Sequence, residues 1–402
     1  MTAARPAPTG ARRIELIALL GALTAFAAIS TDMYLPSLPS IARDFHVAIG
    51  AVEHTLAAFF LGFALGQALF GPLADRFGRR GPLLWGMGLY VLACLLGSAT
   101  TGIAPLIALR FVQAVSACAG TVIARACVRD LFAPDEAPRI FSVMMLIMGL
   151  GPLLAPLLGG YLLLWFGWRS VFLIQGIFGL AAFLVVLVRL PESHTGPRRA
   201  LTPVTLLLDF WRIGIDRRFI GFVLAIATSH AGLFCYITAS PHVFIDIFAV
   251  PAQHFGWFFG ANAVALMTGS QVAGRLMRRM RAERVLVGAQ FGQACAGLLL
   301  LSLALTGLGG LWGIAFGLML YVGLNGAIVP TGAGLAMRPF GLNAGMASAL
   351  LGTFQFGLAT VSSLLLGALA QPSALPMAAV IAACGVGGLL LNLLLSPKDA
   401  TP

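Results

Sequence analysis

Charged residues are scarce in this chain of 402 residues. They make up 10% of the sequence, whereas apolar residues make up 59%, and ordinary soluble domains carry roughly 25% charged residues. A soluble protein of this length could not cover its exterior with so few charges. Apolar runs long enough to cross a lipid bilayer instead recur along the whole sequence. The composition therefore predicts an all-α integral membrane protein.

The motifs of several enzyme and ligand-binding classes are also missing. No segment has the form G-x-x-x-x-G-K-S/T, so ATP is not the expected energy source. No nucleophile elbow is visible, and no His, Cys or Asp cluster has metal-ligand spacing. We read the cysteines as small apolar residues rather than disulfides or ligands, since all six fall inside predicted spans, at positions 94, 118, 127, 235, 295 and 384. We expect no enzyme activity, no cofactor and no metal.

The net charge of +11 could indicate a nucleic-acid surface, but the placement of the charges indicates otherwise. The basic residues lie in short segments between the apolar runs, and no basic stripe is interleaved with exposed aromatic residues. If the N-terminus is inside, 22 of the 25 basic residues fall on the inner side. This is the positive-inside pattern, and it predicts that both termini are cytoplasmic. We expect no nucleic-acid partner.

The apolar runs predict twelve membrane-spanning helices. The first run is full length and the tail before it has no small-residue cleavage site, so we expect a retained helix rather than a signal peptide. The expected limits are 14–36, 51–71, 83–101, 104–127, 140–163, 168–190, 219–240, 254–274, 284–306, 311–336, 344–370 and 375–395.

The longest polar segment divides these spans into six and six. We predict an N-terminal six-helix bundle over 1–190, a cytoplasmic linker over 191–218 and a C-terminal six-helix bundle over 219–402. Each half has a basic, glycine-containing loop after its second span, at 71–80 and 274–284, which indicates a parallel internal repeat. Two six-helix halves around a midplane cavity form the architecture of many secondary transporters.

Asp32 is the most informative single residue. It lies near the far end of the first apolar run, in the segment Ser-Thr-Asp-Met-Tyr-Leu-Pro. An ionised carboxylate in a lipid-spanning helix costs several kcal/mol, so an acid in this position indicates a functional site. It is the one clear carboxylate that the sequence places at membrane depth in the first half. We therefore assign proton coupling to Asp32.

The loop between the second and third spans is the next strongest signal. It reads Gly-Pro-Leu-Ala-Asp-Arg-Phe-Gly-Arg-Arg, in which glycine allows tight turns and the acid can pair with a neighbouring arginine. We expect Arg129, at the inner end of the fourth span, to be that partner. The segment resembles the G-x-L-A-D-R-x-G-R-R signature of the major facilitator superfamily, which implies a gating loop made by Gly71, Asp75, Arg76, Gly78, Arg79, Arg80 and Arg129.

Arg110 is a second charge inside a span. At about 1.5 Å rise per residue it lies roughly 9 Å from the outer edge of the fourth span, a depth similar to that of Asp32. An acid and an arginine at one depth can offset each other's desolvation, although Arg110 could instead extend outward to water. The segment with Gln113 resembles the family's R-x-x-Q-G motif, in which arginine is linked to proton transfer, with Ala114 in place of the glycine.

The fifth span is rich in glycine and proline. Small residues allow close helix contacts and proline bends a helix, so this span is a candidate pivot, although membrane helices are generally enriched in both. The pattern resembles the antiporter motif of exporters in the same superfamily, with Ala155 in place of one glycine. The residues that carry it are Gly151, Pro152, Pro156, Gly159 and Gly160.

Three longer segments narrow the resemblance. Residues 31–39, 61–67 and 348–357 resemble the bicyclomycin-resistance (Bcr/CflA) group of bacterial drug/proton antiporters. Some related antiporters have a second acid two turns before Asp32, where this chain has Thr24. In the second half, Arg278 stands where the first-half loop has Asp75, so the repeat is degenerate.

Other polar and aromatic residues in the spans are candidates for a substrate cavity. His230 could line it or pack against backbone carbonyls, and the aromatic residues could equally be core or face lipid. The candidates are Tyr34, Phe59, Phe63, Gln113, His230, Tyr236, Phe258, Asn262 and Gln355.

These observations and the resemblance predict proton-coupled efflux of small antimicrobial compounds across the bacterial inner membrane by alternating access. The expected partners are a small-molecule substrate, protons and the lipid bilayer, and a monomer is expected. One alternative is a metabolite exporter on the same scaffold, for instance of an amino acid such as cysteine. Another is a membrane sensor that transports nothing.

Overall fold

A computed structural model describes residues 10–133, 135–193, 210–369, 371 and 373–396. Within these ranges the regular structure is entirely helical, and no strand is present. The long helices of the first half are α1 (Gly10–Asp32), α3 (Ile49–Phe77), α4 (Arg80–Ala99), α5 (Ile103–Leu131), α6 (Ala137–Phe166) and α7 (Arg169–Arg189). Those of the second half are α9 (Arg217–Pro241), α10 (Ala252–Leu276), α11 (Ala282–Thr306), α12 (Gly310–Met337), α13 (Ala344–Ala368) and α14 (Leu375–Leu395).

Short helices extend three of these elements. The chain continues from α1 through η1 (Leu35–Ser37) into α2 (Leu38–Asp44), and from α9 into the π-helical turn η2 (His242–Ile247). A 3-10 segment, η3 (Arg338–Asn343), joins α12 to α13. The sequence predicted that the first helix ends at 36, but α1 ends at Asp32. Pro36 has no N–H to bond the Asp32 carbonyl, and its ring would clash with that carbonyl in a continued α-helix.

The long helices correspond to the predicted spans. Among the described residues, eleven helices are long and apolar enough to cross a membrane. The remaining long helix is α10, which has the length of a span but carries Gln253, Asn262 and Gln271 along it. The all-helical, multi-pass fold predicted from the sequence is confirmed.

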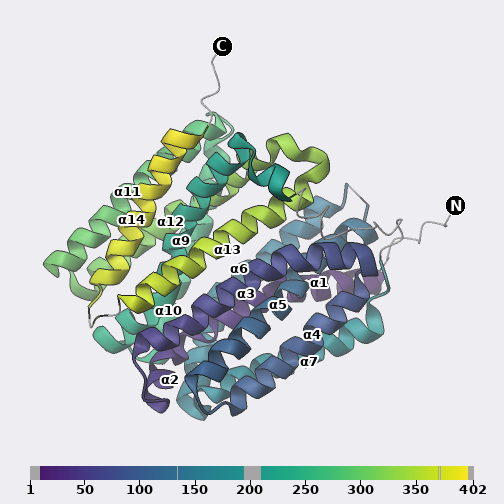
Figure 1. The fold of residues 1–402 in the computed structure, drawn as a ribbon, viewed down its shortest axis with the longest axis horizontal. Coiled ribbons are helices and arrows are strands. Elements are labelled where there is room, and N and C mark those ends of the chain that lie inside the picture. The colour runs from purple at the N-terminus through teal and green to yellow at the C-terminus, as the bar shows by residue number, and fades with distance from the viewer. Residues whose placement is uncertain (1–9, 134, 194–209, 370, 372, 397–402) are drawn as a thin grey trace.

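The helices gather in two groups that lie side by side (Figure 1). Helices α1 and α3 to α7 pack mainly on one another, and α9 to α14 do the same. The groups meet where α3 packs on α13 and where α6 packs on α10. The predicted linker 191–218 joins them, but residues 194–209 lie outside the described ranges.

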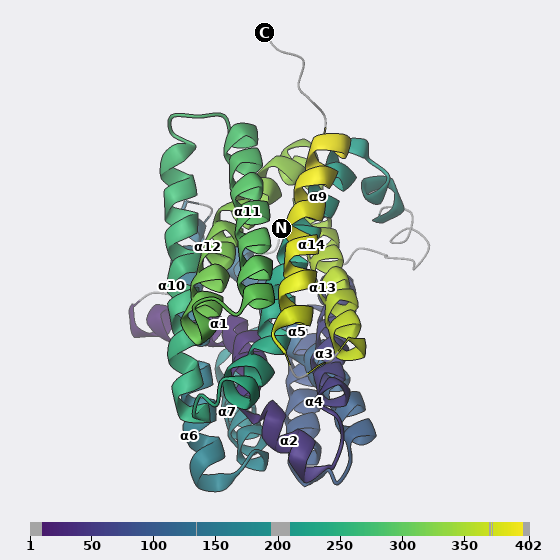
Figure 2. The ribbon, with the colours of Figure 1, turned by 90° about the vertical axis from the view of Figure 1, so that its left-hand side faces the viewer.

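The two ends of the molecule differ in charge. We call one the Arg-rich end, because it holds the loop 77–80 and the turn 277–281, and the other the Asp44 end, where α2 and the α6–α7 connection lie (Figure 2). The first turn of α1 lies at the Arg-rich end, since Arg13 forms an ion pair with Glu136 just before α6. The last turn of α14 is at the same end, against Gly221 at the start of α9.

Small residues allow the first-half helices to approach closely around the candidate site. A Cβ atom at Gly62 of α3 would lie 2.5 Å from the carbonyl oxygen of Phe111 in α5. A Cβ at Gly120 of α5 would lie 2.8 Å from the Leu23 carbonyl oxygen in α1. Because lipid offers little hydrophobic force between helices, such close backbone packing supplies much of their association. It places α1, α3 and α5 in direct contact around Asp32 and Arg110.

Candidate functional site

Asp32 lies at the contact between the two groups of helices. Its side chain is 5% exposed, and among the described residues its carboxylate has no hydrogen-bond or ion-pair partner. Across the contact, the Tyr236 hydroxyl of α9 lies within electrostatic range of Asp32. That hydroxyl accepts a hydrogen bond from Asn262 Nδ2 of α10 at 2.9 Å. Three residues predicted separately from the sequence therefore meet across the two halves.

Arg110 is fully buried inside the first group. Its guanidinium carbon lies 4.3 Å from the ring centre of Tyr34 and 4.4 Å from that of Phe59, so the cation is held between two aromatic faces. Such contacts are worth about 2 kcal/mol or more when water is excluded. Its Nη1 donates to the Ser30 carbonyl oxygen at 3.0 Å and to Gln113 Oε1 at 2.6 Å. The side chain points into the bundle, not outward to water or lipid.

The connection between Arg110 and Asp32 is indirect. No ion pair joins them among the described residues, and Arg110 instead holds the carbonyl oxygen of Ser30, two residues before Asp32 on α1. The Ser30 hydroxyl is in turn 2.7 Å from the Tyr90 hydroxyl of α4. Arg110 therefore fixes the backbone of the turn that presents Asp32.

Gln113 takes part in this buried network rather than facing the other half. Its Nε2 donates to Gln175 Oε1 of α7 at 2.8 Å and lies 3.1 Å from Cys94 Sγ of α4. The Gln175 amide then donates to the Ile29 carbonyl oxygen of α1 at 3.3 Å. The polar groups thus link four helices of the first half and hold the end of α1 against α4, α5 and α7.

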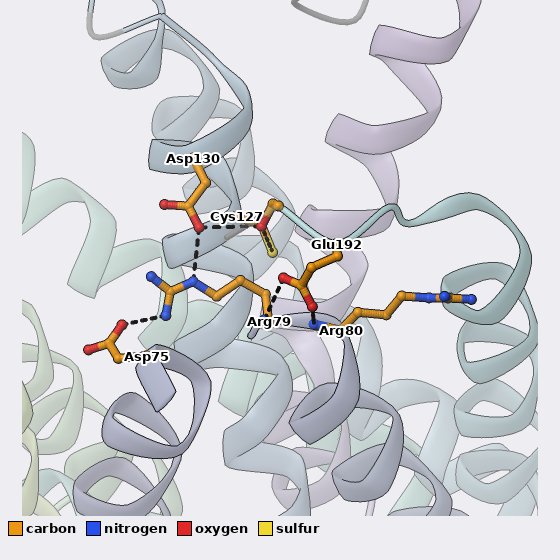
Figure 3. A network of polar contacts seen from close by, with 7 residues as sticks. Asp75, Arg79, Arg80, Cys127, Asp130 and Glu192 are labelled. Carbon is orange, nitrogen blue, oxygen red and sulfur yellow. Dashed lines mark hydrogen bonds and ion pairs between the residues drawn. The ribbon is translucent and has the colours of Figure 1, made fainter. Parts of the chain in front are cut away.

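At the Arg-rich end, the motif at 71–80 is organised around Arg79 (Figure 3). The predicted loop is shorter than expected, because residues 71–77 are the last turns of α3 and only Gly78 makes a tight turn. Arg79 Nη1 is 2.5 Å from Asp75 Oδ1, and its Nε is 2.9 Å from Asp130 Oδ2 of α5. Burial alone would lower the pKa of Arg79, but the hydrogen bonds and charges of Asp130 and Asp75 together raise it above its ordinary value. The side chain therefore stays charged and ties α3 to α5.

The predicted partner of Asp75 was wrong. Asp75 pairs with Arg79 of its own loop rather than with Arg129. Consecutive residues of a helix differ by about 100° in direction, so Asp130 faces the loop while Arg129 faces away from it. The Arg129 guanidinium instead lies near Gly345, at the start of α13 in the other half.

Glu192, which the sequence did not single out, completes the loop network. Its carboxylate accepts hydrogen bonds from the backbone N–H groups of Arg79 at 2.8 Å and Arg80 at 3.2 Å (Figure 3). These are unpaired N–H groups at the start of α4, where a negative charge is stabilising. A Cβ at Gly78, whose φ is +89°, would lie 2.5 Å from Glu192 Oε2. Both the backbone angle and the carboxylate therefore require glycine there.

The predicted antiporter helix is α6, and its small residues lie at helix contacts. Gly151 faces Ala28 of α1, and Gly159 lies directly against the Met33 carbonyl oxygen beside Asp32. A Cβ at Gly160 would lie 2.6 Å from the Ala252 carbonyl oxygen of α10. The helix runs unbroken past Pro152 and Pro156. It therefore touches both the Asp32 turn and the opposite half.

The other candidate cavity residues lie in different parts of the molecule. Phe63 and Phe60 of α3 meet Phe234 of α9 and Phe356 of α13 with ring centres 4.6 Å apart in the closest pairs, an aromatic cluster between the halves. Phe258 is elsewhere, against the exposed Trp312 of α12. Gln355 of α13 is buried, and its Nε2 has no hydrogen-bond partner among the described residues.

His230 has a defined partner in the second half. Its Nδ1 is 2.8 Å from Asn325 Oδ1 of α12, and the Asn325 amide donates to the Ser229 carbonyl oxygen at 3.2 Å. Its ring meets Phe234, a member of the aromatic cluster, edge to face at 5.0 Å. His230 is thus hydrogen bonded to a side-chain amide of its own half rather than to a backbone carbonyl, and its ring packs beside the contact between the halves.

Comparison with known proteins identifies the family. The sequence model of the Major Facilitator Superfamily matches residues 20–364. The chain is 32% identical to the bicyclomycin resistance protein homolog of Haemophilus influenzae, over 95% of this chain and 96% of that one. It is 27% identical to multidrug resistance protein D of Escherichia coli, over 86% of each.

The fold has solved relatives as well. The structure superposes on that of a D-xylose-proton symporter with a TM-score of 0.74 at 18% identity, over 97% of this chain and 99% of that one. The resemblance inferred from the sequence motifs is confirmed by the match to the family and to the bicyclomycin resistance relative. The chain therefore belongs to the Major Facilitator Superfamily, as a multi-pass transporter of the bacterial inner membrane and not an enzyme.

Proposed function

We propose that this transporter exports small antimicrobial compounds in exchange for protons. The observation that carries the proposal is Asp32, a carboxylate that is 5% exposed, has no ion-pair partner among the described residues and lies at the contact between the two groups of helices. A buried charge without a counterion is costly, whereas the protonated acid is not. Movement of the halves that opens the contact therefore changes the proton affinity of Asp32.

The cycle follows from that change. When Asp32 faces the outer solution, a proton binds its carboxylate and favours release of the drug. When it faces the cytoplasm, the proton leaves and the free carboxylate permits the next drug molecule to bind. The same arginine asymmetry that predicts cytoplasmic termini places the Arg-rich end inside. We assign the two six-helix groups as the rocking bodies and the protein as a monomer.

Arg110 supports this role by position. It holds the Ser30 carbonyl oxygen and so fixes the turn that ends at Asp32. It also places a buried positive charge in the same part of the bundle, held between Tyr34 and Phe59. The α6 contact of Gly159 with the Met33 carbonyl oxygen joins this turn to the helix that touches the other half. Motion of α6 would therefore displace the turn that carries Asp32.

The substrate class is inferred from chemistry and from the relatives. The aromatic cluster of Phe60, Phe63, Phe234 and Phe356 offers an apolar surface between the halves, which suits small, mostly apolar molecules. Two relatives with high coverage are named for resistance to bicyclomycin and to multiple drugs. An amino-acid exporter would need polar groups for the ammonium and carboxylate of its substrate, and Asp32 supplies at most one of them.

The decisive experiment is transport in liposomes that contain the purified protein. Bicyclomycin, ethidium and cysteine would each be tested with and without an imposed pH gradient, and drug susceptibility would be compared in a pump-deficient host with and without the gene. We expect the gradient to drive movement of at least one drug and not of cysteine. Cysteine transport alone would favour the metabolite exporter, and the absence of any gradient-driven transport would refute the proposal.

A further inference from the structure

Glu53 is a second buried acid that the sequence did not single out. It lies near the start of α3, at the Asp44 end, and its side chain is 2% exposed. Its Oε2 is buried and has no hydrogen-bond partner among the described residues. An ionised carboxylate in that condition carries the full cost of its lost hydration, whereas the protonated acid does not.

The groups around Glu53 come from both halves. From the second half, η2 brings His242, whose charge acts on Glu53, and α9 brings Cys235. On α3 itself the neighbour is His54, whose ring lies against Gly367 of α13. The titratable and charged groups that act on Glu53 directly or through His242 are therefore Cys235, His242, Asp246 and, from α2, Arg43, whereas the ring of His54 lies against α13.

His242 is already engaged by other acceptors. Its Nδ1 is 3.1 Å from Asp246 Oδ2 and its Nε2 is 3.4 Å from the Gln371 carbonyl oxygen. Asp246 also pairs with Arg43 of the first half at 3.4 Å. The cluster therefore spans the two halves, and neither ring nitrogen of His242 is left to donate to Glu53.

Glu53 is buried beside the contact between the halves, where His242 and Cys235 of the second half act on it. At this contact α2 packs on η2, and α3, which carries Glu53, packs on α13. If these elements separated at the Asp44 end, water would reach the carboxylate and His242 would move away from it. The carboxylate would then ionise at little cost.

We propose that Glu53 is a second proton-binding site, which takes up a proton from the outer solution when the Asp44 end closes and returns it there when that end opens. This rests on the proposed function for its orientation and for the opening motion. On closing, a solvent proton forms an O–H bond with the Glu53 carboxylate, and on opening the bond breaks and the proton returns to water. No other reactant is consumed. Closure at the Asp44 end thereby becomes dependent on the outer pH.

The first test is infrared spectroscopy, which needs no transport. Protein labelled with carbon-13 in its glutamate carboxyl groups would be titrated in lipid, in wild-type form and as Glu53→Gln. We expect a labelled protonated-carboxyl band near neutral pH in the wild type and its loss in Glu53→Gln. Glu283→Gln is the matched control, because Glu283 pairs with Arg338 at the Arg-rich end and is partly exposed. A band that persists in Glu53→Gln would overturn the proposal.

The second test measures the pH dependence of closure through transport. Glu53→Gln removes the charge with little change of shape, so we expect it to fold, and drug export should lose its dependence on outer pH in part while remaining coupled to protons through Asp32. Glu53→Asp keeps a carboxyl group and should retain most of the wild-type pH profile. A Glu53→Gln profile identical to the wild type would overturn the proposal, whereas a wild type with no proton coupling at all would instead overturn the proposed function.

Discussion

The two halves of this transporter use buried polar groups in different ways. The first half buries ionisable groups, Asp32, Glu53 and Arg110, and ties its loop at the Arg-rich end with ion pairs. The second half buries mainly amides and hydroxyls, as in the pair Gln290–Asn392. Its corresponding loop carries exposed arginines, with Arg278 in the place of Asp75. The buried charges therefore belong to the first half, whereas the second half buries uncharged polar groups.

The largest effect is expected at Asp32. Asp32→Asn removes the acid that couples transport to protons but keeps the size of the side chain, so pH-gradient-driven efflux should fall to background while the protein still folds. As a control, Asn325→Asp places an acid of similar size in the second half. Added to the Asp32→Asn protein, it should not restore coupling. Both would be measured in liposomes together with the melting temperature. Normal gradient-driven efflux by a well-folded Asp32→Asn protein would contradict the assignment.

Two buried glutamines give a stability test of the same contrast. Gln113 holds Arg110 and Gln175, so Gln113→Leu should lower the free energy of unfolding by about 2–3 kcal/mol because it leaves buried partners unsatisfied. Gln293 of α11 is equally buried, but neither of its amide atoms has a partner among the described residues. Gln293→Leu should therefore be neutral or stabilise by about 1 kcal/mol. Thermal unfolding in detergent would compare them, and equal losses would remove the distinction.

Two glycines near the Arg-rich end, one in a turn and one in a helix, offer a matched pair. Gly78→Ala should destabilise by about 1–2 kcal/mol, because φ is +89° and the added Cβ would meet Glu192. Gly274→Ala should be neutral or stabilise by up to about 1 kcal/mol, since Gly274 is helical and open space surrounds the position of a Cβ. Unfolding by denaturant in detergent would measure both. A Gly78→Ala protein as stable as the wild type would show that Glu192 and the loop can shift freely.

The smallest effect is expected at the loop acid. Asp75→Ala should reduce turnover by about three- to fivefold, the rate equivalent of a partly exposed ion pair worth up to about 1 kcal/mol, and leave drug affinity unchanged. Arg278→Ala, at the corresponding position of the second half, should leave both within twofold. Transport rate and equilibrium drug binding would be measured on purified protein. An equal loss of affinity and rate in Asp75→Ala would indicate misfolding or a direct binding role.

Much of the fold could be predicted because the membrane imposes a simple rule on the sequence. Apolar runs and the charges between them predicted the helices, and among the long helices that the structure describes α10 is the one less apolar than a typical span. The end of α1 was placed four residues too late because the apolar run continues past Asp32, although Pro36 already indicated the break.

The site was less predictable because its partners come together only in three dimensions. The sequence offers Asp75 several arginines as partners. The direction in which each side chain leaves its helix decides that Arg79, and not Arg129, pairs with Asp75. Glu192 lies in a short polar stretch after α7, and nothing local shows that it caps α4. Glu53 lies near the edge of a predicted span, where an acid would ordinarily be hydrated, but in the structure it is buried beside groups of the opposite half.

The aromatic cluster between the halves has a consequence for how this protein responds to temperature. Phe60, Phe63, Phe234 and Phe356 join the halves through apolar surface rather than directed hydrogen bonds. Where opening of this contact admits water, it carries a positive heat-capacity change, as exposure of apolar surface does. Apolar association weakens on cooling. The balance between the two access states should therefore shift toward opening of this contact as the temperature falls, even at constant pH.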